Sequence, residues 1–249
     1  MNITVIVPTY NEAECIGKAL FALEAVRVTL VHHQLNILVF DSASQDDTVE
    51  IVKAFQAEFA HIHLLTEPRK SGLGSAYVQA MRYAWEVLQA ELIFEYDADG
   101  SHQPQFILPM IQAIEQGADV ALGSRYIAGG QIQVGWPWYR RWISQWGNRV
   151  ARWILTRRYR DFTSGFRATR TVFLQQALAA PLLSQNYAYK IHLLWNLHQL
   201  QARIVEVPIV FIDRERGDSK FPRNNIGESL KLVLLLRWRA MKKQPIVSE

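Results

Sequence analysis

The 249-residue chain has a single cysteine, Cys15, and therefore no partner for an internal disulfide. No basic, apolar and small-residue leader precedes the first strand-like segment, which together with the cysteine count favours a reducing, cytosolic compartment. Long apolar runs are also missing. The longest uninterrupted aliphatic run covers residues 232–236, far below the roughly 20 residues that a membrane-spanning helix needs. We therefore expect no transmembrane segment.

Repeats and compositional bias are absent as well. Glycine and proline occur 13 and 9 times, which is ordinary, and no stretch repeats itself. This composition excludes collagen-like, solenoid and low-complexity proteins. With 49% hydrophobic and 20% charged residues, the chain has enough apolar surface for a folded globular domain.

Acidic residues are missing from positions 131–160, although the net charge of the whole chain is only +4. This stretch holds seven arginines and five of the eight tryptophans, namely Arg140, Arg141, Arg149, Arg152, Arg157, Arg158, Arg160, Trp136, Trp138, Trp142, Trp146 and Trp153. Such a segment is typical of contact with an anionic partner that has an apolar body. A phospholipid surface fits this description well, and a nucleic acid fits it less well.

Short apolar runs alternate with amphipathic stretches in the first half of the chain, which predicts an α/β fold with a mostly parallel sheet flanked by helices. We expect strands at residues 3–8, 36–41, 61–66, 92–96 and 119–123, with helices between them. Beyond residue 130 we expect a helical arginine and tryptophan block, a helical region over 171–200, a strand over 204–212 and a final helix over 226–242. No linker separates the halves, so we expect one domain over 1–225 and an amphipathic helix with a tail over 226–249.

Two aspartates follow the fourth predicted strand. Asp97 and Asp99 come after the apolar run LIFEY, and alternate residues at a strand end can direct both carboxylates to one point. Hard oxygen ligands suit Mg²⁺ or Mn²⁺ that carries a substrate diphosphate. The alternative is a solvated turn, because aspartate and glycine are common in loops.

The first and second strands end at the same edge. Tyr10 can stack on a base, and the carboxylates of Glu12 and Asp41 can accept hydrogen bonds from a nucleoside. Asp46 and Thr48 are better explained as helix caps. Lys70, Gly72 and Gly74 open the next helix, where a glycine-rich turn either cradles an anion or simply allows close packing.

Seven segments between residues 6 and 221 together resemble a known family. They are IVPTYNEAECI, VFDSASQDDT, RKSGLGSAY, YDADGSHQP, ALGSRY, DFTSGFR and FIDRERGDSKF. The combination is similar to the GT-A glycosyltransferases of family 2, and within them to the dolichyl or polyprenyl phosphate mannosyltransferases that lack a transmembrane domain. Each piece is weak alone, whereas the set covers nearly the whole chain.

The resemblance implies a role for each matching position. The nucleoside would be held by Pro8, Tyr10, Glu12, Val39 and Asp41. The metal and the diphosphate would be held by Asp97, Ala98, Asp99 and Ser101. Phosphates would be faced by Arg125, Lys190, Arg214 and Lys220, with Asp99, Arg125 and Arg214 as the catalytic group. Three positions depart from the family pattern: Ser42 and His192 stand where acids are usual, and Ser101 is a poor metal ligand.

The acceptor follows from a missing group. Inverting transfer to a hydroxyl needs a general base, and residues 120–160 contain no carboxylate. A phosphate monoester needs none, because its second pKa is near 6. We therefore expect a phosphate monoester as the acceptor, and the resemblance implies mannose transfer from GDP-mannose to a polyprenyl phosphate. The alternatives are transfer of glucose from UDP-glucose, a hydroxyl acceptor with Asp161 as base, or a noncatalytic nucleic-acid binder, which is a poor fit. Asp161 is better explained as a loop anchor that pairs with an arginine such as Arg167.

Two helical stripes suggest a peripheral position on the cytoplasmic face of a membrane. The first consists of Trp142, Trp146, Val150 and Trp153, and the second of Leu230, Val233, Leu234, Arg237, Trp238 and Met241. Arginines beside the first stripe can extend toward lipid head groups. Both stripes can instead pack on the domain or on a second subunit, and an anchoring membrane protein is a further option.

Overall fold

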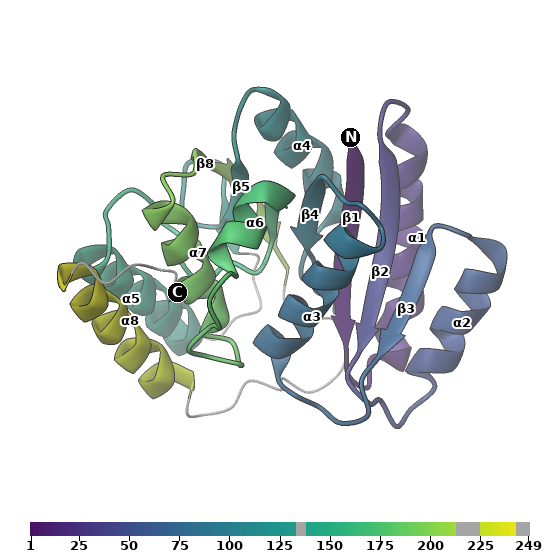
Figure 1. Cartoon of the computed structure of the whole chain (residues 1–249), viewed down its shortest axis with the longest axis horizontal. Coiled ribbons are helices and arrows are strands. Elements are labelled where there is room, and N and C mark those ends of the chain that lie inside the picture. The colour runs from purple at the N-terminus through teal and green to yellow at the C-terminus, as the bar shows by residue number, and fades with distance from the viewer. Residues whose placement is uncertain (133–137, 213–224, 243–249) are drawn as a thin grey trace.

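A seven-stranded sheet forms the centre of the molecule (Figure 1). The computed structural model describes residues 1–132, 138–212 and 225–242, without the side chains of 139–141, 225 and 226. The strand order is β3-β2-β1-β4-β7-β5-β8, and only β7 is antiparallel to its neighbours. These strands are β1 (Asn2–Thr9), β2 (Gln34–Asp41), β3 (Ile62–Thr66), β4 (Leu92–Glu95), β5 (Val120–Ser124), β7 (Arg167–Arg170) and β8 (Ile204–Pro208). The predicted fold class is confirmed.

Helices cover both faces of the sheet, because both faces of its strands are apolar. Along β1, Ile3, Val5 and Val7 pack on one side with helices α1 (Ala13–Thr29), α2 (Thr48–Glu58) and α4 (Ile107–Glu115). Ile6 points to the other side, toward α3 (Leu73–Glu86), α6 (Thr171–Ala177) and α7 (Tyr189–Gln199). A short 3₁₀ turn (Pro104–Phe106) precedes α4.

A third apolar cluster joins the last helices to the sheet. Helices α5 (Trp138–Ile154) and α8 (Asn225–Met241) lie side by side at the end of the molecule that contains β5 and β8 (Figure 1). Leu155 after α5, Leu194 of α7 and Leu232 of α8 are buried together there. Val233, expected on the exposed stripe of the final helix, also belongs to this buried cluster. No helix within the described ranges is long and apolar enough to cross a bilayer.

Three details differ from the sequence-based expectation. Strand β7 was not predicted, because the sequence RATR places charged side chains at positions that an interior strand normally fills with apolar ones. The helical region at 171–200 is interrupted between α6 and α7 by a connection that contains Pro181. The strand expected at 204–212 ends at Pro208, and β9 (Val210–Phe211) pairs instead with β6 (Gln131–Ile132) in a separate two-stranded sheet.

A buried ion pair explains how Arg167 can lie inside the sheet. Glu95 and Arg167 are register partners across β4 and β7, and Glu95 Oε1 accepts hydrogen bonds of 2.7 and 2.6 Å from Arg167 Nε and Nη2. Tyr189 Oη donates to Glu95 Oε2 at 2.8 Å. Both members of the pair are 1% exposed, so each compensates the charge of the other where water cannot.

Replacing only one member of this pair is expected to be more harmful than replacing both. Arg167→Met leaves the Glu95 carboxylate buried and unpaired, and should lower the free energy of unfolding by about 3–5 kcal/mol. The double variant Glu95→Leu/Arg167→Met should recover a large part of that loss. Urea denaturation measures the free energy of unfolding of Arg167→Met, Glu95→Leu and the double variant. A double variant that loses as much stability as the two single variants added together would contradict this account.

Candidate active site

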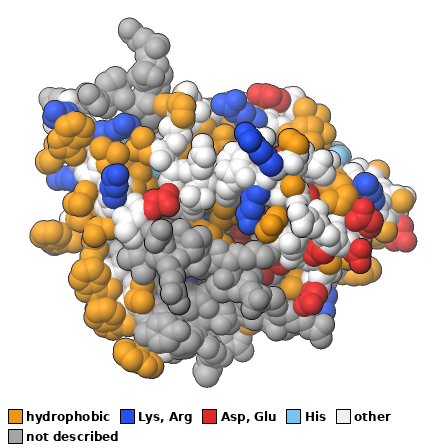
Figure 2. Space-filling model, turned by 90° about the horizontal axis from the view of Figure 1, so that it is seen from below, with side chains coloured by type: hydrophobic (Ala, Val, Ile, Leu, Met, Phe, Trp, Pro, Cys, Tyr) orange, Lys and Arg blue, Asp and Glu red, His pale blue; other side chains and the backbone are white. Residues whose placement is uncertain are grey.

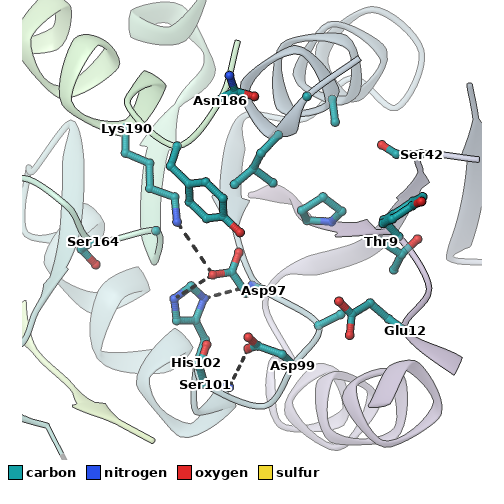
Figure 3. Close-up of a pocket in the computed structure, with 18 of the residues that line it drawn as sticks. Thr9, Glu12, Ser42, Asp97, Asp99, Ser101, His102, Ser164, Asn186 and Lys190 are labelled. Carbon is teal, nitrogen blue, oxygen red and sulfur yellow. Dashed lines mark hydrogen bonds and ion pairs between the residues drawn. The ribbon is translucent and has the colours of Figure 1, made fainter. Parts of the chain in front are cut away.

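A pocket of about 290 Å³ opens at the carboxyl ends of β1 and β4 (Figure 3). Its walls come from distant parts of the chain. The residues that line it include Pro8, Thr9, Tyr10, Glu12, Ser42, Lys70, Gly72, Asp97, Ala98, Asp99, Ser101, His102, Arg125, Thr163, Ser164, Gly165, Asn186, Tyr187, Lys190 and Phe211. Crevices at the carboxyl ends of parallel strands are where α/β proteins usually bind ligands.

Asp97 stands at the centre of the pocket, two residues beyond β4. The Asp97 side chain is 26% exposed, and its Oδ2 atom lies 3.8 Å from Lys190 Nζ. Tyr77 Oη donates to Asp97 Oδ1 at 3.3 Å. Figure 3 shows Lys190 and His102 converging on this carboxylate from one side. The contacts hold Asp97 in place while part of it still faces the pocket.

His102, which the sequence analysis did not assign, braces the same aspartate. The Asp97 main-chain N–H donates to His102 Nδ1 at 3.0 Å, so the ring proton belongs on Nε2, which lies 3.6 Å from Asp97 Oδ2. The ring is stacked on Phe166 with centroids 4.9 Å apart. Burial lowers the pKa of His102, although the charge of Asp97 acts in the opposite direction. Its place directly after the aspartate motif was the available signal.

Asp99 and its neighbours form a turn at the mouth of the pocket. Asp99 Oδ1 accepts a 3.0 Å hydrogen bond from Ser101 N–H, and Gly100 between them has φ +77°, a conformation that favours glycine. Ala98 and Ser101 are buried and line the pocket. The structure therefore brings the four residues predicted for the metal and diphosphate into one loop.

Lys190 reaches Asp97 through a gap that glycine leaves open. A Cβ on Gly165 would overlap the Lys190 ammonium and come within 3.4 Å of Asp97 Oδ2. Arg167 Nη1 donates to the Lys190 main-chain oxygen at 3.4 Å, which connects this end of α7 to the buried ion pair. His192 does not line the pocket. Its Nδ1 accepts from Leu183 N–H at 3.0 Å, and burial lowers its pKa to about 4.

Arg125 lines the pocket while it is held from behind by Asp161. Nε and Nη2 of Arg125 donate to the two Asp161 oxygens at 2.7 Å each, and Nη2 also donates to Thr163 Oγ1 at 2.8 Å. Burial would raise the pKa of Asp161, but the Arg125 charge and the hydrogen bonds from Arg125 and Thr163 together outweigh it and lower that pKa. Asp161 is thus a loop anchor, as expected, but its partner is Arg125 and the partner of Arg167 is Glu95.

The residues predicted for the nucleoside divide into two groups. Pro8, Tyr10 and Glu12 line the pocket, and Lys70 Nζ lies 3.6 Å from the centroid of the Tyr10 ring. Val39 and Asp41 are buried behind it: Asp41 accepts from Thr9 Oγ1 at 2.9 Å and from Ser44 N–H at 2.9 Å. Both remain predictions for the nucleoside-bound protein.

The adjoining caps and glycines are structural. Asp46 Oδ1 and Oδ2 accept from the main-chain N–H groups of Thr48 and Ala13, at 3.1 Å each, and so hold the starts of α2 and α1. Burial would raise the pKa of Asp46, but these bonds and the Thr48 hydroxyl lower it. Gly74 N–H donates to Gln185 O at 2.7 Å, and a Cβ there would come within 2.8 Å of Tyr189. Close packing, rather than an anion cradle, therefore explains Gly74.

Two predicted residues, Arg214 and Lys220, lie outside the described residues. Within the described residues, no group of three or more His, Cys, Asp or Glu side chains converges on a metal position. The pair Asp97 and Asp99 nevertheless fits a divalent cation of the Mg²⁺ type. Such an ion is typically bound by one or two carboxylates together with substrate phosphates, and keeps several waters.

Comparisons with known proteins place the chain in a family. Residues 4–178 match the family described as Glycosyl transferase family 2. The chain is 36% identical over 231 residues to a polyprenol monophosphomannose synthase of Mycolicibacterium smegmatis, covering 91% of this chain and 83% of the relative. It is 35% identical over 247 residues to an undecaprenyl-phosphate mannosyltransferase of Micrococcus luteus, covering 97% and 98%.

The fold is also found among solved structures. Glucosyl-3-phosphoglycerate synthase of Mycobacterium tuberculosis, solved with Mn²⁺, UDP and glucosyl-3-phosphoglycerate, superimposes with a TM-score of 0.64 at 17% identity. The match covers 98% of this chain and 81% of that one. This likeness concerns the fold, whereas the family match and the two relatives above concern the sequence itself. The chain belongs to glycosyl transferase family 2 and is a glycosyltransferase with a GT-A-like fold.

Proposed function

We propose that this glycosyltransferase moves mannose from GDP-mannose to a polyprenyl monophosphate with inversion, giving a β-linked lipid phosphomannose. The observation that carries the proposal is the charge arrangement of the pocket. Asp97 and Asp99 lie on one loop, and the cations Lys190 and Arg125 lie around them. Such a site suits a reaction in which a diphosphate leaves and a phosphate attacks. The names of the two sequence relatives support the same donor sugar and acceptor class.

The divalent ion, Mg²⁺ or Mn²⁺, would be held by Asp97 and Asp99 with Ser101 at their side. When bound, it neutralises charge on the leaving diphosphate. The protein's own part is to keep the carboxylates in position. Tyr77 and His102 hold Asp97, and Ser101 N–H holds Asp99, so the site does not have to be assembled when the donor arrives.

Within the described residues, a phosphate acceptor agrees with the position of Asp161, the carboxylate that would otherwise serve as base. The carboxylates that line the described pocket are Glu12, Asp97 and Asp99. Asp161, the alternative general base, is fully buried and does not line the pocket. Both of its carboxylate oxygens accept hydrogen bonds from Arg125. Its lowered pKa makes it a weak proton acceptor. An ionised phosphate oxygen attacks without losing a proton.

Arg125 is placed to guide that acceptor. Asp161 and Thr163 fix its Nε and Nη2, and within the described residues its Nη1 donates to no other group. A guanidinium that is fixed on one edge can present the other edge to phosphate oxygens with little loss of entropy. The buried carboxylate behind it keeps the guanidinium oriented between catalytic cycles.

The exposed surface of α5 and α8 supports an acceptor that is bound in a membrane. Trp138, Trp142, Trp146 and Trp153 are 52–80% exposed. Exposed side chains of α8 continue this surface: Leu230, Leu234, Trp238 and Met241. Figure 2 shows hydrophobic side chains gathered at the end of the molecule that α5 and α8 occupy in Figure 1, with basic side chains among them. Exposed tryptophan beside arginine is typical of an interfacial surface.

The direct test is a transfer assay with purified protein, Mg²⁺ or Mn²⁺ and polyprenyl phosphate, with labelled GDP-mannose and UDP-glucose offered in parallel. Label from GDP-mannose should enter the organic phase. Asp97→Asn should reduce this transfer by about a hundredfold or more. Replacing a residue that only supports a metal ligand already lowers metal affinity or activity by up to about a hundredfold. Asp47→Asn makes the same change at an exposed helix cap and should be silent.

Other results would redirect the proposal. Label from UDP-glucose alone would replace mannose by glucose. No lipid product from either donor, with folded protein, would reject a polyprenyl phosphate acceptor.

Gly165→Ala tests the position of Lys190. The new methyl group displaces the flexible ammonium rather than the backbone, so stability should change little, whereas kcat/KM should fall about ten- to hundredfold. Gly17→Ala is the matched control, since a Cβ there meets only ordinary contacts of 3.8 Å or more. Lys190→Met added to Gly165→Ala should lower kcat/KM no further. A Gly165→Ala enzyme with unchanged kcat/KM would show that this lysine position is dispensable.

His102 variants separate support of the Asp97 main chain from support of its carboxylate. His102→Asn keeps an acceptor near Nδ1 but loses the Nε2 donor, and His102→Phe loses both. Mn²⁺ affinity, read by electron paramagnetic resonance, should weaken about ten- to a hundredfold in the order wild type, Asn, Phe. His32→Gln, at an exposed position, serves as the control. Unchanged Mn²⁺ affinity in both variants would limit His102 to packing.

A further inference from the structure

A second pocket, of about 240 Å³, lies beside α5 and has no part in the site described above. It is lined by Tyr126, Gln145, Asn148, Arg149, Arg152 and Arg160. Four of these residues, at positions 145, 148, 149 and 152, share one face of α5 through their spacing of three and four. Arg160 and Tyr126 close the pocket from neighbouring loops. We call it the arginine pocket.

The arginine pocket is strongly cationic. Three of its six residues are arginines, and none of them takes part in an ion pair within the described part of the chain. Glu206 accepts hydrogen bonds from the main-chain N–H groups of Arg160 and Asp161, at 3.0 and 3.1 Å, and not from their side chains. Three guanidinium groups around one hollow repel each other unless an anion joins them.

One polar atom of the pocket also has no acceptor. Arg152 Nε is buried and makes no hydrogen bond within the described residues, and Arg152 Nη2 has only a long 3.5 Å contact with Arg157 O. A buried donor without a protein acceptor is uncommon in native proteins and calls for a partner such as a water or an ion. An oxyanion with several oxygens can satisfy this donor and the neighbouring arginines together.

The arginine pocket borders the exposed tryptophans. On α5, Arg149 lies on the helix face between the pocket residues and the side that carries Trp142, Trp146 and Trp153, which are 52–76% exposed. Tryptophan and arginine in this order place apolar rings at the level of lipid chains and guanidinium groups at the level of head groups.

We propose that the arginine pocket binds the phosphate head group of an anionic phospholipid in the membrane on which the enzyme rests. This inference rests on the proposed function only for the presence of that membrane. The acceptor's own phosphate is a poorer candidate, since no residue lines both pockets. Asn148 stands between them: its Nδ2 donates to Thr163 Oγ1 at 3.2 Å and its Oδ1 accepts from Phe162 N–H at 2.7 Å.

The test compares two double variants of the full chain by co-sedimentation with phosphatidylcholine vesicles, with and without phosphatidylglycerol. Arg149→Gln/Arg152→Gln removes two pocket charges. Arg157→Gln/Arg158→Gln removes the same charge from exposed positions nearby that do not line the pocket. With phosphatidylglycerol, the pocket variant should bind about 30-fold more weakly than wild type, at about 1 kcal/mol per arginine. The affinity of the control variant for the same vesicles should fall by no more than about threefold, a tenth of that loss.

The single variant Arg160→Gln keeps its main-chain contacts with Glu206 and is therefore expected to fold even if the double variant does not. It should also weaken vesicle binding. Equal losses in the pocket and control variants would mean diffuse surface charge and would overturn the proposal. So would tight binding of inorganic phosphate by wild type in calorimetry that is lost in Arg149→Gln/Arg152→Gln, which would make the ligand of this pocket a free ion.

Transfer to a short-chain polyprenyl phosphate in detergent keeps this test separate from the proposed function. A pocket variant with a raised KM for that acceptor would assign the pocket to the acceptor phosphate and overturn the head-group proposal. Pocket-dependent vesicle binding without mannose transfer would refute the proposed function and leave this inference standing.

Discussion

The ion pair between Glu95 and Arg167 is the interaction on which the rest of the structure depends. It lies inside the sheet across β4 and β7, and it allows an antiparallel strand with a buried arginine to sit between parallel neighbours. Tyr189 donates to the same carboxylate, and Arg167 reaches the main chain of Lys190, so the start of α7 is positioned from within the core. One buried charge pair thus connects the sheet to the wall of the active site, at the cost of desolvation that only a complete pair can offset.

The active site repeats the same principle at its surface. Two charged groups that face the pocket are held by neighbours behind them: Asp97 by Tyr77 and His102, and Arg125 by Asp161. In the proposed reaction, such bracing would keep charges oriented toward the substrate phosphates, so that little reorganisation would be needed. Gly165 shows how tight the arrangement is, because a single methyl group there would displace the Lys190 ammonium.

The end of the molecule formed by α5 and α8 carries an exposed apolar surface. Helices α5 and α8 bury one face against α7 and leave tryptophan, leucine and methionine exposed on the other. A surface of this kind is unfavourable in water and favourable at a lipid interface. If the acceptor is a membrane lipid, the enzyme must hold its pocket close to the bilayer, and the arginine pocket beside the tryptophans supplies charge where head groups lie. Donor chemistry and membrane contact are then placed on separate parts of one sheet-based scaffold.

By itself, the sequence determined the parallel sheet, its flanking helices, and the loop that carries Asp97, Ala98, Asp99 and Ser101. Local periodicity and the short segments such as YDADGSHQP carry that information, because it depends on neighbours in the chain. Only the tertiary structure decided which charges pair. Asp161 was expected beside an arginine such as Arg167, yet it binds Arg125, 36 positions away, while Arg167 binds Glu95. Strand β7 was hidden for the same reason, because a charged strand inside a sheet is stable only through partners that are distant in sequence. His102 lies only five positions from Asp97, but the sequence alone does not show that its ring accepts from the Asp97 main chain and stacks on Phe166.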